Sequence, residues 1–483
     1  MNILIVGNGF DLSHYLPTKY DHFMDVMGAI EDKNTGGLPR NLSERKIEEW
    51  LEELDKLFQK RNEVEQPSHH MNFDELFLKT RDPNFISKTK EYYLTDSILL
   101  SAQDVIKIQY RLSLNCWYQY FKNHVVEIKT WIDFEQKIEK VLMILVSCTL
   151  EIERIKRSSE LFEYFDHNGK DGNRIKERDF KTLNFFNFMA LEEYKVNLPV
   201  SSLYESRSYK MKKRNNLNPK FCHGKDLENG FNPSGFLDFL YQQLEEFIII
   251  FDQYLELIVN LLQPKSQLQI NAKEWLYPDK IYSFNYTNTY QRIYDNVEVD
   301  FLHGSSGENQ NIILGVSDVE DGVLKKLKAY GFTKYQQKLF KDTDFLFLDK
   351  YKAKIRKDKI EIEALKMQVM MPLGERYVRS LHEVLSEKER DQFLNLNFYI
   401  WGHSLDVSDQ DYIIDLFSLN DDMDRNVKVT VYYFDQNAKF ALLNNLLAIL
   451  GKDKVEQWMK NKWLVFNPNP EIKFNEMISE KTA

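Results

Sequence analysis

Cysteine is scarce in this sequence, with three residues among 483. Because Cys116, Cys148 and Cys222 are odd in number and far apart, they indicate neither a disulfide framework nor a zinc ribbon. The ten histidines add no zinc-ligand pairing, since the adjacent His69 and His70 cannot direct both rings at one ion from a regular helix face. We therefore expect free, buried thiols and no metal site.

Long apolar runs are also missing. No uninterrupted apolar stretch reaches the roughly 18 residues that a membrane helix needs. The first residues lack the basic region and the long apolar stretch of a signal peptide. With 43% hydrophobic residues the chain can still bury a large core, and its length suggests two or three domains. We expect a cytoplasmic, globular protein with no membrane partner.

Two common catalytic motifs are absent as well. The chain contains neither a Gly-x4-Gly-Lys phosphate loop nor a Gly-x-Ser-x-Gly nucleophile elbow. These absences argue against the ATPase and serine-hydrolase mechanisms that depend on those motifs.

The charge balance disfavours nucleic acid as a general partner, because the formal net charge is −10. One local stretch is basic, and it comprises Arg207, Lys210, Lys212, Lys213, Arg214 and Lys220. It lies beside Asn-, Gly- and Pro-rich sequence, so we interpret residues 207–220 as a solvated loop. Nucleic-acid binding is not predicted, although this stretch leaves it open.

An apolar strand followed by a glycine turn opens the chain. Asn2–Val6 is predicted as a parallel strand covered on both faces, and Gly7-Asn8-Gly9-Phe10-Asp11 follows it directly. Two glycines let backbone amides approach a pyrophosphate closely, so the loop indicates a nucleotide site. However, Leu12 stands where the dinucleotide fingerprint has its third glycine, and no strand with an acidic end follows about 20 residues later. An ordinary nicotinamide dehydrogenase is therefore disfavoured.

Helical periodicity dominates the next part of the chain. After a capped helix start at Thr18 and Asp21, residues 43–262 show long helical patterns and almost no strand pattern. The clearest pieces are 43–59, 104–150 and 235–262. Residues 166–178 and 201–234 are polar and are expected as excursions between helices.

Strand patterns return in the last part of the chain. They occur at 280–284, 297–302, 312–315, 397–402 and 427–434, with helices expected at 323–390 and 436–460. The first strand must join these later strands, because an isolated strand in front of a helical bundle could not satisfy its backbone. The alternation predicts a discontinuous, Rossmann-like α/β domain of residues 1–35 plus 270–483, with a helical domain of residues 36–269 inserted.

Polar motifs follow four of the predicted strands. Besides residues 7–11 they are Asn285-Tyr286-Thr287, His303-Gly304-Ser305 and Gly402-His403-Ser404-Leu405, the last followed by Asp406 and Asp409. Ligands bind beyond the carboxyl ends of strands in open α/β sheets. We therefore expect these motifs to share one site.

Together, the four motifs resemble the ordered signature of the sirtuin-like NAD-consuming fold. The longer sequence motifs around them are similar to those of the bacteriophage abortive-infection AbiH family. These motifs are residues 5–12, 16–18, 283–287 and 402–405, with further similarity at 131–135 and 313–316. The resemblance implies an antiphage effector that hydrolyses NAD to nicotinamide and ADP-ribose, with NAD as substrate and no resident cofactor.

The resemblance also assigns roles. Asn285 and His303 fall on the motifs whose asparagine and histidine flank the nicotinamide ribose. A neutral imidazole can act as a base near working pH, and the amide of Asn285 could orient water or hold the ribose hydroxyls. The remaining ligand contacts are expected from Gly7, Asn8, Gly9, Phe10, Asp11, Thr287, Gly402, Ser404 and Asp409. The glycine loop would bind pyrophosphate, helped by the positive end of the following helix, and Ser404 and Asp409 would bind the adenosine end.

One residue departs from the sirtuin-like pattern. The pattern usually has an aspartate two residues after the asparagine, in contact with nicotinamide, whereas this chain has Thr287. For this reason, and because no Cys-x-x-Cys zinc module is present, protein deacylation is doubtful. The departure leaves open a module that senses a nucleotide such as ADP-ribose without turnover. A nucleic-acid- or tRNA-directed toxin that uses residues 207–220 is a third alternative.

Several of these residues have a structural interpretation too. Asn285 could bond its own backbone at a turn, His303 could be an exposed turn residue, and Asp11 could cap the next turn. His403 is expected to be structural, with contact to the ligand as the lesser alternative. Glu135 is expected on a solvated helix face, with a place at the site as the lesser alternative. An NAD hydrolase must be inactive in healthy cells, so we expect control by homo-oligomer assembly, or by a phage-derived or partner-protein trigger acting through the helical domain.

Overall fold

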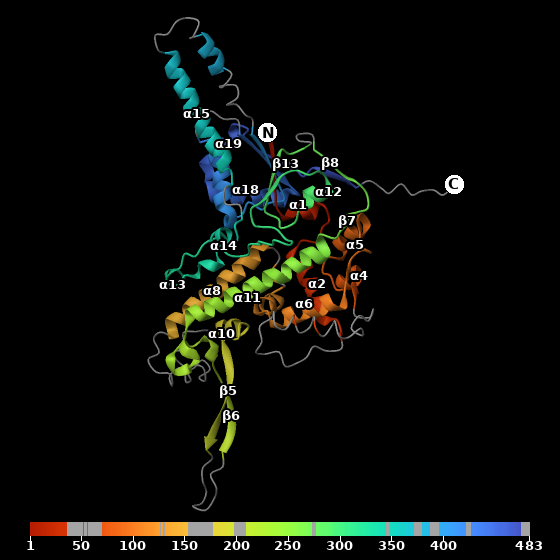
Figure 1. Cartoon of the computed structure of the whole chain (residues 1–483), viewed down its shortest axis with the longest axis vertical. Coiled ribbons are helices and arrows are strands. Elements are labelled where there is room, and N and C mark those ends of the chain that lie inside the picture. Colours follow the sequence, from red (N-terminus) through yellow and green to blue (C-terminus); the bar gives the residue numbers. More distant parts are fainter. Residues whose placement is uncertain are drawn as a thin grey trace, which may run out of the picture.

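The computed structural model describes residues 1–35, 52, 56, 70–125, 127–128, 131–152, 177–197, 209–272, 277–343, 347–370, 379–386, 396–421 and 427–474. A parallel sheet lies against a body of helices, and two slender projections extend toward opposite ends of the long axis (Figure 1). The helix predicted at 43–59 lies outside the described residues, apart from residues 52 and 56. Of the polar excursions predicted at 166–178 and 201–234, residues 166–176 and 201–208 lie outside them as well.

Six parallel strands form the sheet. From one edge to the other they are β10 (Val299–Phe301), β9 (Lys280–Ser283), β1 (Asn2–Val6), β11 (Leu396–Trp401), β12 (Val427–Tyr433) and β13 (Leu464–Pro468). The first strand of the chain therefore lies between two strands that follow it by almost 280 and 400 residues. The prediction of an α/β sheet that unites the two ends of the sequence is confirmed.

Both faces of the sheet are covered. Ile3 and Ile5 of β1 pack in a core with α17 (Gln410–Ser418), α18 (Gln436–Leu450) and α19 (Lys452–Lys460). Leu4 and Val6 point to the other face, where α1 (Asn8–Ser13) and α12 (Thr289–Ile293) contribute Phe10 and Tyr290. Since successive side chains of a strand alternate between faces, burial on both sides explains why β1 is apolar at nearly every position.

The strand order creates a crevice at one edge. Numbered along the chain, the six strands lie in the order 3-2-1-4-5-6, so the succession reverses between β1 and β11. At such a reversal the connections leave toward opposite faces and open a crevice beyond the carboxyl ends of the strands. β1 ends at Val6, β9 at Ser283 and β11 at Trp401, each directly before one of the polar motifs.

One strand prediction was wrong, and one strand of the sheet was not predicted. Residues 312–315 are buried but join no sheet, because Gln337 makes hydrogen bonds to both the amide and the carbonyl of Leu314 and Lys341 donates to the carbonyl of Ile312. These side chains satisfy the backbone groups that a neighbouring strand would otherwise bond. The edge strand β13 was not predicted, since it is short and ends at a proline, which is tolerated only at edges and strand ends.

A body of helices packs beside the sheet around an aromatic core. Its longer members are α2 (Tyr20–Asp32), α5 (Pro83–Tyr92), α6 (Ala102–Leu114), α7 (Cys116–Asn123), α8 (Trp131–Ile152) and α11 (Pro233–Tyr254). Phe23, Trp131 and Phe251 contact one another in this core. Capping side chains define several starts, including Ser101 for α6 and Asn232, followed by a proline at N1, for α11.

The start of α2 differs from the prediction. The helix begins at Tyr20, and its N-cap residue Lys19 makes no side-chain capping bond. The hydroxyl of Thr18, the predicted cap, has no hydrogen-bond partner among the described residues. Instead, the backbone carbonyls of Pro17 and Thr18 accept bonds from Tyr254 and Trp131, so tertiary contacts fix this entry.

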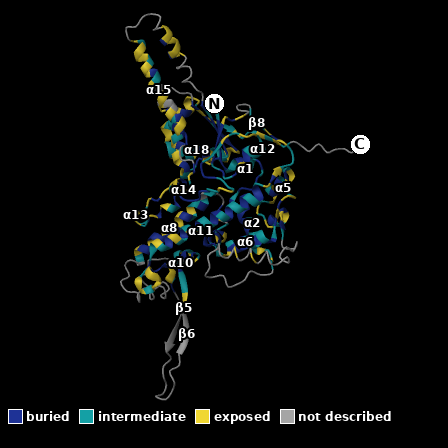
Figure 2. Cartoon of the chain, viewed as in Figure 1, coloured by how far each residue is buried: buried dark blue, intermediate teal, exposed yellow. Residues whose placement is uncertain are grey.

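Within the described residues, most of the basic stretch is a strand and not a loop, whereas residues 207–208 lie outside them. β6 (Tyr209–Leu217) pairs with β5 (Met189–Asn197) in an antiparallel hairpin, with Glu192 opposite Arg214 and Glu193 opposite Lys213. The prediction that residues 43–262 contain almost no strand was wrong here, because β5 and β6 are strands. Their hairpin forms one of the two projections in Figure 1. The other is α15 (Asp349–Val369), whose outer part is largely exposed (Figure 2).

Smaller elements complete the fold. β8 (Leu268–Asn271) pairs with β14 (Glu471–Phe474). Two short pairs join β2 (Met71–Asn72) to β4 (Leu99–Leu100) and β3 (Tyr93–Leu94) to β7 (Gln263–Pro264). None of the strands described between residues 36 and 269 belongs to the six-stranded sheet. The boundaries at residues 36 and 269 stay a prediction.

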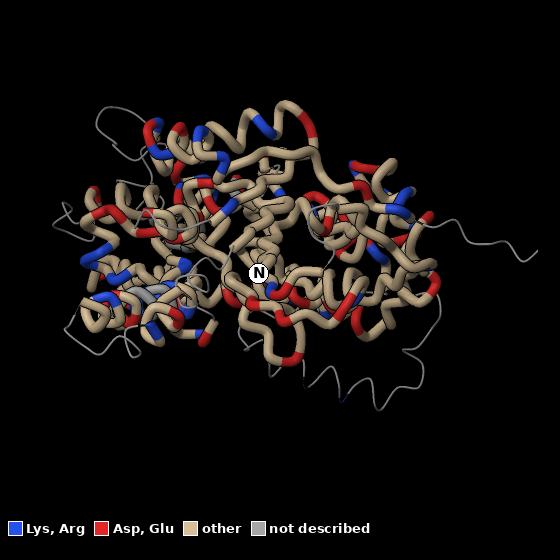
Figure 3. Tube along the Cα trace, turned by 90° about the horizontal axis from the view of Figure 1, so that it is seen from above, with Lys and Arg blue, Asp and Glu red and all other residues tan. Residues whose placement is uncertain are grey.

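The three cysteines are free and buried, as predicted. Among the described helices, none has the length and apolarity that a membrane span requires. Seen from above, basic and acidic residues are interspersed around the molecule (Figure 3), so that view shows no face of a single charge.

Candidate functional site

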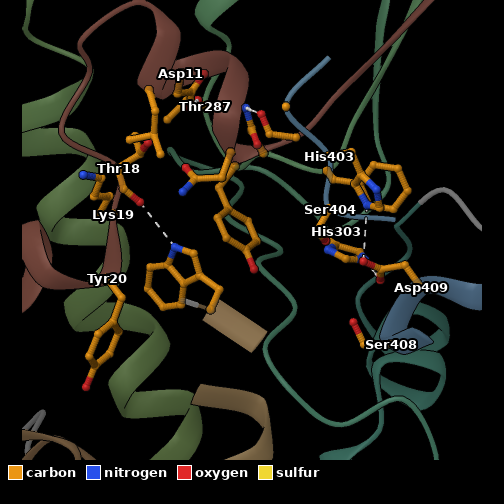
Figure 4. A pocket seen from close by; sticks show the side chains of 18 of the residues that line it. Asp11, Thr18, Lys19, Tyr20, Thr287, His303, His403, Ser404, Ser408 and Asp409 are labelled. Carbon is orange, nitrogen blue, oxygen red and sulfur yellow. Dashed lines mark hydrogen bonds and ion pairs between the residues drawn. The ribbon is translucent and has the colours of Figure 1, made fainter. Parts of the chain in front are cut away.

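One cavity of about 350 Å³ lies beyond the carboxyl ends of β1, β9 and β11 (Figure 4). It brings together residues from all four polar motifs and from the helical body. Of the residues predicted from the sequence, those that line it are Gly7, Asn8, Asp11, Asn285, Thr287, His303, Gly402, Ser404 and Asp409. Gly9 and Phe10 are the two predicted contacts that do not line it.

Phe10 belongs to the core beneath the site. Its ring is buried against Trp401 and His14 on the face of the sheet away from α17 to α19. Burial lowers the pKa of His14 to about 4, and its two ring nitrogens contact the carbonyl of Phe10 and the hydroxyl of Tyr294. A motif that appeared to belong wholly to the ligand loop is thus partly a packing motif.

Gly7 and Gly9 allow the loop after β1 to pack closely against the backbone of residues 401–403. The amides of Gly7 and Gly9 donate to the carbonyls of Trp401 and Gly402 at 3.0 and 2.8 Å, and the amide of Phe10 donates to Gly7. A Cβ on Gly7 or Gly9 would lie 2.6 or 2.7 Å from the backbone of residues 402–403. These three amides are therefore engaged within the protein, and α1 after them has six residues.

Replacing Gly402 by alanine is expected to destabilise the fold by at least about 2 kcal/mol, because its φ is +76° and an added Cβ would lie 2.0 Å from the amide nitrogen of Phe10. Denaturant unfolding of Gly402→Ala measures this loss. Gly28→Ala is the matched control, since Gly28 lies in helix α2 with open space around it. That control is expected to be neutral or more stable, and equal stability of both variants would contradict the close-packing role.

Asn285 is held in one orientation at the end of β9. Its backbone is tied to the hydroxyl of Ser283, and its side-chain Nδ2 donates to the carbonyl of Gly7 at 3.0 Å. Since a carbonyl only accepts, this bond determines which side of the amide is nitrogen. The side chain lines the cavity, and its amide oxygen takes no part in the bond to Gly7. The side chain of Asn285 therefore bonds the loop after β1 and not a turn of its own backbone.

Asp11 and Thr287 form a buried pair. The hydroxyl of Thr287 donates to Asp11 Oδ2 at 2.6 Å, and it also contacts the hydroxyl of Thr289 at 3.0 Å. Asp11 Oδ1 has no partner among the described residues, so Asp11 does not cap the following turn. Burial raises the pKa of Asp11 to about 6, and the bond from Thr287 opposes that rise.

This raised pKa predicts a pH-dependent effect of Asp11→Asn. The folded protein holds the proton of Asp11 more tightly than the unfolded chain, so its stability falls as the pH rises from about 4 through 6. The amide variant has no such cost, and we expect it to be more stable than wild type by about 1–3 kcal/mol at pH 8 and about equal at pH 4. Denaturant titrations at both pH values test this, and a pH-independent difference would contradict it.

His303, Asp409 and His403 lie in contact at the opposite side of the cavity (Figure 4). Nε2 of His303 is 3.2 Å from Asp409 Oδ1, without hydrogen-bond alignment, and Nε2 of His403 is 3.3 Å from Oδ2. Burial lowers the pKa of His303 to about 4, so the ring is neutral near pH 7. Nδ1 of His403 accepts from the amide of Leu405, which places a proton on Nε2, facing Asp409.

Lys334 and Glu135 complete the site; the sequence did not predict Lys334 there, and it offered this place for Glu135 only as the lesser alternative. Nζ of Lys334 lies 3.1 Å from Asp409 Oδ1 and 2.8 Å from Glu135 Oε1. Burial would raise the pKa of Asp409, but Lys334 and His303 outweigh it and hold that pKa well below its usual range. Lys334 gave no signal in the sequence because it is one of two lysines on a short helix, α14 (Lys334–Phe340), and no motif distinguishes it. Glu135 was expected on a solvated face, yet its side chain is only 14% exposed.

Comparison with known protein families accounts for the motifs. The family described as bacteriophage abortive infection AbiH matches residues 3–433. The chain belongs to the AbiH family. The match extends over β1 to β12 and includes every residue that lines the cavity.

Membership of the AbiH family implies a role in abortive infection, the defence against bacteriophage that the motifs predicted. Comparisons of this AbiH protein with curated proteins and with solved structures found no match. Within its described residues, no group of three or more His, Cys, Asp or Glu side chains is arranged to hold a metal ion.

Proposed function

We propose that this AbiH protein is a sirtuin-like NAD hydrolase that releases nicotinamide and ADP-ribose during abortive infection. One observation carries the proposal. Asn285 and His303, from the ends of β9 and β10, line the same cavity as the loop that follows β1.

The sheet supports a nucleotide as the ligand. The strand order 3-2-1-4-5-6 is that of the doubly wound sheets that bind dinucleotides at the point of reversal, and the cavity lies there. The amides of Gly7 and Gly9 bond within the protein, so close backbone approach is their contribution. Contacts to the phosphates are left to Asn8 and to Lys19, which also line the cavity.

The chemistry follows from the two motifs that carry the reacting groups. In NAD hydrolysis the bond from ribose C1′ to the nicotinamide nitrogen breaks, its electron pair neutralises the pyridinium, and water adds to C1′ with loss of a proton. A neutral His303 can accept a proton from a ribose hydroxyl, and Asp409 at 3.2 Å would stabilise the imidazolium that forms. The fixed oxygen of Asn285 can accept a hydrogen bond from a hydroxyl or from water.

Asp11 offsets the departure at Thr287. Although the chain lacks the aspartate that the sirtuin-like pattern has two residues after the asparagine, Thr287 itself holds the carboxyl of Asp11. The unpartnered Oδ1 of Asp11 offers an acceptor to a substrate amide or hydroxyl. Asp11, which follows β1, thus supplies a carboxyl next to Thr287, the position where the sirtuin-like pattern has its aspartate.

Control through the helical body is the regulatory part of the proposal. Trp131 and Glu135 of α8 line the cavity together with the strand-end residues. A trigger protein or homo-oligomer contact that shifts α8 would therefore change the site directly. This geometry supports control through the helices.

A nucleotide sensor is the second candidate function. It is favoured by the low pKa of His303, which makes the neutral ring a weak base. The toxin alternative has less support, because no described residue of the basic stretch lines the cavity.

Incubation of the purified full-length protein with NAD distinguishes these functions. Chromatography of the products is expected to show nicotinamide and ADP-ribose in equal amounts, and an infected-cell extract can supply the trigger. Tight binding of ADP-ribose with no product would instead identify a sensor.

A further inference from the structure

Glu135 is a buried carboxyl with one oxygen unused. Its Oε1 is 2.8 Å from Nζ of Lys334, and its Oε2 is buried without a hydrogen-bond partner among the described residues. The residue lines the cavity from α8, whereas the other charged groups of the site come from the loops and helices that follow the strands. An unpaired buried carboxylate oxygen is costly unless it has a function or a bound water.

The titratable groups around Glu135 come from three other parts of the chain. Lys334 lies on α14, Asp409 and Asp406 lie beyond β11, and Tyr286 lies beyond β9. Burial raises the pKa of Glu135 to about 7, Lys334 opposes the rise, and the negative charges of Asp409 and Asp406 add to it. A carboxyl that titrates near working pH at a cavity is suited to acid–base chemistry.

We infer that Glu135 is a second catalytic residue of the site, whose carboxylate accepts the proton of the water that attacks ribose C1′. The inference rests on the proposed NAD hydrolysis and names the group that carries out its second half. His303 and Asp409 then act at the ribose hydroxyls, and Glu135 acts at the water. Lys334 contacts both Glu135 and Asp409 and so is a positioning residue between the two halves.

The proposed step balances without a further reactant. The bond between C1′ and the nicotinamide nitrogen breaks and its electron pair remains on nicotinamide. The water oxygen forms a bond to C1′, and one water proton moves to Glu135, which later releases it to solvent. The proton that His303 accepts from the ribose hydroxyl returns to that hydroxyl oxygen. The net products are nicotinamide, ADP-ribose and one proton.

Glu135→Gln tests the inference, because glutamine keeps an oxygen for Lys334 and cannot accept the proton. We expect NAD hydrolysis by the full-length variant to be about 100-fold slower, with ADP-ribose binding, measured by calorimetry, within threefold of wild type. In the wild type the rate of hydrolysis is expected to rise with pH around 7, because Glu135 must be ionised. That acidic limb should be missing in the variant.

Glu139→Gln is the matched control, since Glu139 lies one turn further along α8 and is exposed. It is expected to leave the rate and the pH profile unchanged. If wild type hydrolyses NAD and Glu135→Gln does so at a similar rate with the same pH profile, the role of Glu135 is overturned and the proposed function stands. If triggered wild type itself produces no nicotinamide, both are overturned. A slow variant that has also lost ADP-ribose binding would overturn the catalytic role in favour of a structural one.

Discussion

Asn285→Ala is expected to reduce NAD hydrolysis by the purified protein about 100- to 1000-fold, the range typical when one fixed polar group at a reacting centre is removed. The reason is geometric. The bond from Asn285 Nδ2 to the carbonyl of Gly7 fixes the side chain and leaves its oxygen for the substrate or for water. Alanine removes the only part of the residue that the proposal uses. Product formation measured by chromatography gives the rate.

Asn288→Ala provides the control for this prediction. Asn288 lies on the same loop, is exposed, and makes no side-chain capping bond to α12. We expect its rate to remain within twofold of wild type. Equal rates for Asn285→Ala and Asn288→Ala would remove Asn285 from the reacting centre, whereas an unfolded Asn285→Ala protein would be recognised by circular dichroism and replaced by Asn285→Asp.

Asp409→Asn is expected to lower the free energy of unfolding by about 3–5 kcal/mol, the usual cost of removing one partner of a buried ion pair. The carboxylate of Asp409 lies against Nζ of Lys334 and Nε2 of His403. Both of these nitrogens carry a proton and can only donate hydrogen bonds to it. An asparagine would direct its own NH2 at one of them. Denaturant unfolding at pH 7 gives the loss, and hydrolysis is expected to fall with it because the imidazolium of His303 loses its counter-ion.

The pH dependence checks that this loss comes from the charge. The folded-state pKa of Asp409 is held below its unfolded value, so its stabilising contribution is present above about pH 4 and is lost as the pH falls further. The difference between wild type and Asp409→Asn should therefore narrow in acid. Asp411→Asn, an exposed neighbour in α17, should cost less than about 0.5 kcal/mol. A comparable loss in both variants would contradict the account.

The sequence predicted that the four polar motifs would meet at one edge of the sheet because strand ends carry directional information. Once Asn2–Val6 and residues 280–284 were expected in one parallel sheet, the residues after each strand had to meet at one edge. The structure brings Asn285, His303 and Asp409 to one cavity for that reason. Their catalytic roles stay a prediction.

What the sequence did not predict depends on tertiary contacts. Lys334 enters the site from a helix in the stretch predicted as helical at 323–390, and the neighbouring carboxylates make its burial tolerable. Residues 312–315 have the composition of a strand, but the side chain of Gln337 takes the place of a partner strand. The hairpin of β5 and β6 is rich in charged residues, so its pairing has little apolar signal.

The most direct test of the central claim is the amount of NAD in infected cells, measured by mass spectrometry in cells that express wild type or Asn285→Ala. We predict that NAD falls after phage infection with the wild type, with a matching rise in ADP-ribose, and stays constant with the variant. Protection from phage by the wild type with no change in NAD would contradict NAD hydrolysis and favour a nucleotide sensor.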